Sequence, residues 1–125
     1  MKRILLSLGL VAIAAISVAC SSAAAQPQPS GPVVDSPTVV AKDLKFVTTS
    51  IELPADKNVT VHFDNQESAP HNLAIYGDSG FSQKVSIGEI VSSKKVDQVV
   101  PALKAGSYFF RCDVHPDMKG TITVK

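Results

Sequence analysis

The chain has 125 residues, of which 45% are hydrophobic, 6% aromatic and 18% charged. This size and composition predict one small globular domain with additional segments rather than two domains. Twelve Lys and Arg balance eleven Asp and Glu, for a net charge of +1. Because the basic excess typical of nucleic-acid-binding proteins is missing, we expect no nucleic-acid partner.

The amino-terminal segment has the layout of a secretory signal, in which Lys2 and Arg3 precede an uncharged aliphatic stretch that ends at Ala19. The following Ser-Val-Ala-Cys20 is similar to a bacterial lipobox, although Ser stands where an aliphatic residue is usual. We therefore interpret residues 1–19 as a signal peptide and Cys20 as the lipidation site. We expect an exported, membrane-anchored lipoprotein, periplasmic or at the cell surface.

Two other interpretations of this segment are open. Small residues at positions 23–25 offer a site for ordinary signal cleavage, which would give a soluble exported protein. An uncleaved anchor is the weaker alternative, because the apolar stretch is shorter than the roughly 20 residues needed to span a bilayer.

Residues 20–37 are rich in Ser, Ala, Gln and Pro, which predicts a flexible tether because such a composition cannot bury a core. The domain is expected to occupy residues 38–125. It contains short runs, most of them with apolar residues at every second position, separated by turn residues. These candidate strands are Val39–Val47, Asn58–Asp64, His71–Tyr76, Val96–Val100, Ser107–Cys112 and Thr121–Val124.

Period-two alternation gives each of these runs one face for a core; Tyr108, Phe110 and Cys112 share such a face. No stretch of the domain shows a long helical period with caps, and Phe81–Val91 could be a loop, a strand or one helical turn. Many short strands with frequent turns predict an all-β, antiparallel β-sandwich.

The cysteines single out a candidate metal site. The chain has two, and if Cys20 is lipidated or removed, Cys112 has no disulfide partner in an oxidising compartment. A lone cysteine on a strand is most often a buried structural residue. Here, however, Cys112, His115 and Met118 follow one another at intervals of three residues. Pro116 and Gly120 favour a tight turn that lets the three side chains face one point.

A fourth ligand has to come from elsewhere in the chain. His71 is the candidate, since it follows Pro70 and begins a run that could lie beside the Cys112 strand. Two imidazoles, a thiolate and a weakly bound thioether suit one blue (type 1) copper ion. These four residues leave no open position for a substrate, so an enzyme is not expected. The third histidine, His62, is interpreted as a solvated surface residue.

The pattern Pro70-His71-Asn72, followed by Tyr-x-Phe-x-Cys112-x-x-His115-Pro-x-Met118-x-Gly, resembles the cupredoxin family, and its short loop is most similar to the amicyanin type. The resemblance implies a Greek-key β-sandwich with copper at one end. It implies that Asn72, which is not a ligand, braces the Cys112 loop through hydrogen bonds. It also implies that His115 reaches solvent and lets the electron leave.

The resemblance therefore predicts an electron-transfer protein that cycles Cu(I)/Cu(II), acts as a monomer and docks transiently with redox partner proteins. An apolar surface around the second histidine docks partners in amicyanin-like proteins, whereas Asp117 lies within the loop here, which leaves the partner open. A periplasmic copper chaperone or sensor on the same scaffold is the alternative function. A metal-free adhesion or structural domain is a third.

Overall fold

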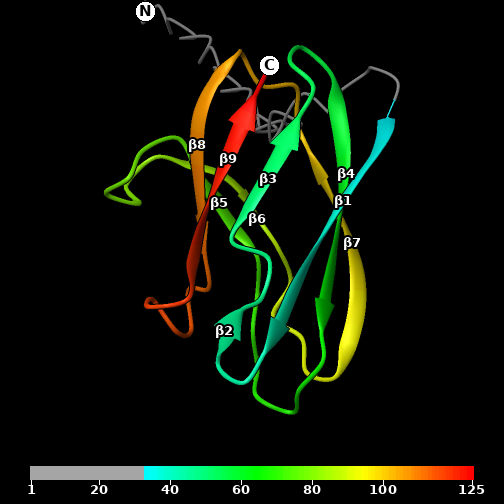
Figure 1. Ribbon diagram of the computed structural model, residues 1–125, viewed down its shortest axis with the longest axis vertical. Helices are drawn as coiled ribbons and strands as arrows, with labels where there is room; N and C mark the ends of the chain where they lie inside the picture. Colours follow the sequence, from blue (N-terminus) through cyan, green and yellow to red (C-terminus); the bar gives the residue numbers. More distant parts are fainter. Residues whose placement is uncertain (1–32) are drawn as a thin grey trace, which may run out of the picture.

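The computed structural model describes residues 33–125, which form two packed β-sheets and confirm the predicted all-β sandwich (Figure 1). One sheet has the strand order β2-β1-β4-β7 and the other the order β3-β9-β8-β5-β6. The strands are β1 (Val33–Lys42), β2 (Lys45–Phe46), β3 (Ser50–Leu53), β4 (Asn58–Asn65), β5 (Ala74–Tyr76), β6 (Lys84–Ile87), β7 (Lys94–Val100), β8 (Gly106–Arg111) and β9 (Lys119–Val124).

The sheets are not purely antiparallel, which the sequence did not indicate. Strand β1 pairs with β4, and β3 with β9, in parallel, whereas the other strand pairs are antiparallel. Parallel neighbours need a connection that crosses over. Here β3, which lies in the second sheet, comes between β1 and β4 in the chain. The chain therefore passes from one sheet to the other and back between β1 and β4.

Strand β1 differs from its prediction at both ends. It begins at Val33, ahead of the domain boundary expected at residue 38, and its register with β4 shifts next to Pro37, which has no amide to donate. At the other end a hairpin turn at Asp43 and Leu44 separates β1 from β2, where the sequence predicted one run. Both turn residues have a φ of 55°, as in a type I′ turn.

The core lies between the inward faces of the two sheets. Phe46 packs edge-on against Phe63 and Phe110, with ring centroids 6.4 and 5.2 Å apart. Gly120 pairs with Phe110 across β8 and β9, and a Cβ at this glycine would lie 2.2 Å from the Phe110 ring. The glycine is therefore required by the close approach of the ring. Buried aliphatic residues surround this cluster: Val39, Val59, Val61, Leu73, Ile75, Val100 and Ile122.

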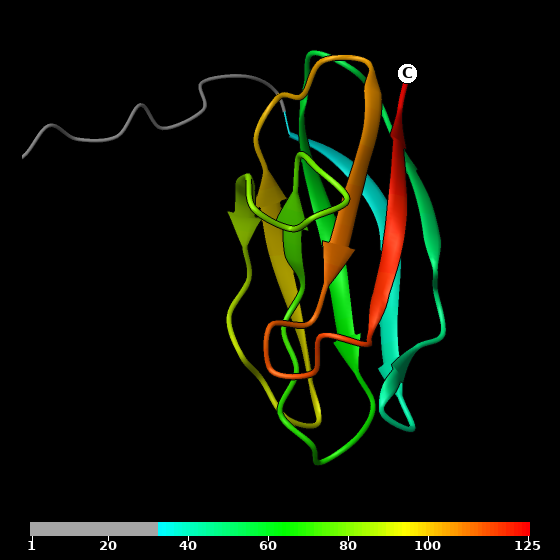
Figure 2. The same cartoon turned by 90° about the vertical axis from the view of Figure 1, so that its left-hand side faces the viewer.

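Three segments were left open, missed or assigned differently by the sequence analysis. The ambiguous stretch from Phe81 to Val91 contains the edge strand β6, and strand β3 was not predicted. The run assigned to His71–Tyr76 is a strand only over β5, since His71 lies before it in an isolated bridge to Val91. Figure 2 shows the β8–β9 connection close to the lower end of the molecule, where the connection after β4 also lies.

Candidate metal centre

The first predicted ligand, His71, is fixed by its main chain before β5. It exchanges two hydrogen bonds with Val91, from the His71 amide (3.0 Å) and to the His71 carbonyl (2.9 Å). The Asn65 side chain donates to the carbonyls of Ala69 (2.8 Å) and Val91 (2.7 Å), which joins the two segments. The imidazole is fully buried. Its position therefore depends on residues well separated in the chain.

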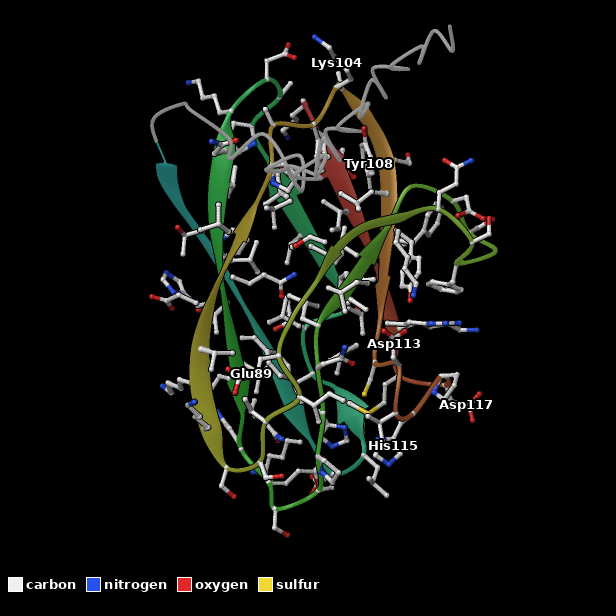
Figure 3. All side chains as sticks on the ribbon, turned by 180° about the vertical axis from the view of Figure 1, so that it is seen from behind. Glu89, Lys104, Tyr108, Asp113, His115 and Asp117 are labelled. Carbon is white, nitrogen blue, oxygen red and sulfur yellow. The ribbon has the colours of Figure 1, made fainter. Side chains whose placement is uncertain are left out.

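The other three predicted ligands lie in one short loop between β8 and β9. The Cys112 amide donates to the Met118 carbonyl and the Met118 amide to the His115 carbonyl, each at 2.9 Å. These bonds close the loop on itself. Cys112 and Met118 are buried in the core cluster, whereas His115 is partly exposed. Figure 3 shows His115 and Asp117 at the same end of the molecule, opposite Lys104.

The structure brings His71, Cys112 and His115 together. The Cys112 Sγ lies 3.6 Å from the His71 Nδ1 and 3.9 Å from the His115 Nδ1, and the two nitrogens are 3.1 Å apart. Among the residues that the structure describes, this is the group of histidine, cysteine and acidic side chains that could hold a metal ion. A buried thiol and two imidazoles that converge from two segments fit a soft or borderline transition metal.

A carboxylate that the sequence analysis did not identify holds the far side of His71. The His71 Nε2 donates to the Glu67 Oε1 at 2.7 Å, because Nδ1 faces the centre. The same oxygen accepts the Leu44 amide at 2.9 Å, from the β1–β2 turn. This amide, together with His71, lowers the pKa of Glu67 although burial opposes the shift. In the sequence, the only sign of this contact is that Glu67, a carboxylate, lies close to the candidate ligand His71.

Hydrogen bonds on the loop side involve Asn72 and Asp113. The Asn72 Oδ1 accepts the Asp113 amide at 2.8 Å, next to Cys112. Burial alone would raise the pKa of Asp113, but hydrogen bonds from Tyr76 and Arg111 outweigh it and lower this pKa. Tyr76 and Arg111 therefore stabilise the negative charge of Asp113, next to the candidate ligand Cys112.

The remaining predicted residues lie elsewhere. His62 is on the outer face of β4, 37% exposed, and contacts Asp97 across the sheet at 2.7 Å, so it is not part of the centre. Cys20 and the predicted signal peptide lie outside the described residues.

A known domain family matches most of this chain. The sequence model of the cupredoxin-like domain matches residues 9–124. The chain belongs to the cupredoxin-like family. Amicyanin from Paracoccus versutus is 30% identical over 95 residues, which cover 73% of this chain and 66% of that protein.

Solved structures of cupredoxins share the fold. The crystal structure of the same amicyanin superposes with a TM-score of 0.56 at 26% identity, over 72% of this chain and 81% of the other. Dithionite-reduced auracyanin from Roseiflexus castenholzii gives a TM-score of 0.65 at 18% identity, over 75% and 99%. Within this cupredoxin, the thiol of Cys112, the imidazoles of His71 and His115, and the buried thioether of Met118 are the donor set of a type 1 copper site.

Proposed function

We propose that this cupredoxin transfers single electrons between redox partner proteins outside the cytoplasm and catalyses no reaction of its own. When bound, a copper ion supplies the Cu(I)/Cu(II) couple. The observation that carries the proposal is the convergence of His71, Cys112 and His115 at one end of the sandwich (Figure 3). Because the surrounding hydrogen bonds hold these donors in place, little needs to move when the charge changes.

The burial of the donors supports electron transfer over the transfer of copper itself. His71 and Cys112 are fully buried and Met118 is 3% exposed, so only His115 is near solvent. An electron can pass through a partly exposed imidazole, whereas an incoming chelator would have to displace three buried side chains. The chaperone or sensor alternative therefore requires an opening of the loop.

Outer contacts of the ligands support this assignment. We propose that Asn72 braces the Cys112 loop through the Asp113 amide and that Glu67 orients His71 through its Nε2 proton. Neither side chain binds copper. Both fix the direction in which a ligand faces the ion.

Voltammetry combined with a chelator challenge tests the proposal. The copper-loaded protein should give a reversible one-electron wave and keep its copper when a Cu(I) chelator is added. Rapid copper transfer to the chelator, with no reversible wave, would instead support the chaperone. A chain that binds no copper would leave the metal-free adhesion or structural domain as the remaining function.

We also propose that the protein is exported and tethered by a lipid on Cys20. The charged start, aliphatic stretch and lipobox-like motif support this location. Residues 33–125 contain no helix that is long and apolar enough to cross a membrane. Cys20→Ala should move the protein from the membrane fraction to the soluble exported fraction. Equal membrane association of both forms would contradict lipid anchoring.

A further inference from the structure

A group of four side chains on the outer face of the second sheet includes those of the two residues that flank Cys112. Arg111 and Asp113 are 28% and 29% exposed, whereas Cys112 between them is buried toward the centre. The Asp113 Oδ1 accepts the Tyr76 hydroxyl at 2.6 Å and the Arg111 Nε at 3.1 Å. Both chain neighbours of the thiol are thereby tied to each other and to β5.

Aromatic rings enclose the arginine of this group. The Arg111 guanidinium lies 5.0 Å from the Tyr76 ring centroid and 4.9 Å from that of Phe81, within the range of a cation–π contact. The two rings meet edge to face at 5.4 Å. We call Tyr76, Phe81, Arg111 and Asp113 the outer clasp.

The loop that carries Phe81 is built to hold it there. Phe81 has a φ of 55°, a conformation that costs energy for a bulky residue and persists only where its surroundings impose it. The Asp78 carboxylate accepts the amides of Ser82 (3.0 Å) and Gln83 (2.7 Å), and the Phe81 amide donates to the Asp78 carbonyl (3.1 Å). These bonds fix the ring against Arg111.

We propose that the outer clasp positions the Cys112 sulfur from outside the sandwich, a role that rests on the proposed function. Strand β8 ends at Arg111, and the Arg111 and Asp113 side chains meet outside the sheet while Cys112 between them is buried. Holding these two side chains therefore restrains the direction of the Cys112 side chain. The Asp113 amide, bonded to Asn72, adds a restraint on the main chain. Loosening the clasp therefore lets the thiol move without disturbing the other ligands directly.

The apoprotein gives the first test, since it needs no copper. In a Cys20→Ser background Cys112 is the only thiol, and its labelling by a disulfide reagent reports opening of the loop. Tyr76→Phe removes the hydrogen bond to Asp113 and keeps the ring. We expect labelling about tenfold faster, the size expected for a hydrogen bond to a charged group.

Tyr108→Phe is the matched control. It removes a tyrosine hydroxyl from β8, the strand that leads to Cys112, where this hydroxyl donates to the Lys104 carbonyl at 3.2 Å. Figure 3 shows Tyr108 and Lys104 far from Asp113. It should leave labelling unchanged. Asp113→Asn, a second variant of similar shape, should act in the direction of Tyr76→Phe.

The copper-loaded forms give the second readout. Tyr76→Phe should alter the relative intensities of the thiolate-to-copper absorption bands, and Tyr108→Phe should not. Unchanged bands and labelling, or faster labelling fully accounted for by a lower free energy of global unfolding, would overturn the clasp. A wild-type protein that shows no such bands would refute the proposed function, while thiol labelling would still decide the clasp.

Discussion

The two segments that supply the candidate ligands are held in different ways. The Cys112–Met118 loop closes on itself through two main-chain bonds between its own residues. His71 is instead held by Val91, Asn65 and Glu67, and through Glu67 by the β1–β2 turn. The main-chain closure of the loop is local, although Asp113 within it is also bonded to Asn72 and Tyr76. The His71 position has no such local closure and depends on Val91, Asn65 and Glu67. Loss of the Glu67 contact should therefore affect His71 before it affects the loop.

Removal of copper should have the largest effect, because the ion joins the two segments. A ligand that binds only the folded state at a concentration 1,000 times its Kd adds about 4 kcal/mol. For a domain of this size we expect the apoprotein to melt more than about 10 °C below the copper form. Differential scanning calorimetry measures the shift, and equal melting temperatures would mean that copper does not join the segments.

Glu67→Gln should weaken copper binding by loosening His71 and not the Cys112–Met118 loop. Loss of the carboxylate that holds a ligating imidazole typically costs at least about tenfold in metal affinity. A competition titration of copper against a chelator measures this change. Glu52→Gln, which removes an exposed ion pair with Lys125 at 2.7 Å, is the control and should leave the affinity unchanged. Equal affinities for wild type and Glu67→Gln would show that the outer contact of His71 is not needed.

Met118→Gln should change the reduction potential of the copper while the loop stays intact. Its main-chain bonds to Cys112 and His115 remain, so the loop should stay closed and bind copper. Because the weak axial ligand helps to set the potential, voltammetry should show a changed potential with an intact one-electron wave. An unaltered potential would remove Met118 from the ligand set.

His62→Ala should have the smallest effect. This histidine and Asp97 form an exposed contact outside both ligand segments. We expect the free energy of unfolding to change by no more than about 0.5 kcal/mol in chemical denaturation, with no change in copper affinity. A loss of copper binding would mean that the outer face of β4 is coupled to the centre.

The ligand loop could be predicted from the sequence, whereas the contacts that hold His71 could not. The spacing of Cys112, His115 and Met118 is local information. Alternation was enough to place Tyr108 and Phe110 of β8, and Cys112 just after it, on the side of the core. Glu67 was missed because its role depends on contacts to Leu44 and His71 that form only in the assembled fold. Nothing in the residue types of a loop indicates which carboxylate will face an imidazole.

Strand errors have similar causes. Asp43 and Leu44 take up positive φ without the Asn-Gly signal usual for such a turn, so one run was predicted where the chain reverses. Strand β3 has only four residues and gains its partner, β9, from the far end of the chain. Strand β6 lies at a sheet edge and lacks a clean alternation of buried and exposed residues.

A type 1 copper centre in this protein depends on the Cys112 thiolate. Its most direct test is the visible and electron paramagnetic resonance spectrum of the protein after addition of cupric ion, beside the same spectra of Cys112→Ser. We expect an intense red-region absorption with a narrow copper hyperfine splitting for the wild type, and the loss of both in the variant. A colourless wild type, or a variant that stays blue, would contradict it.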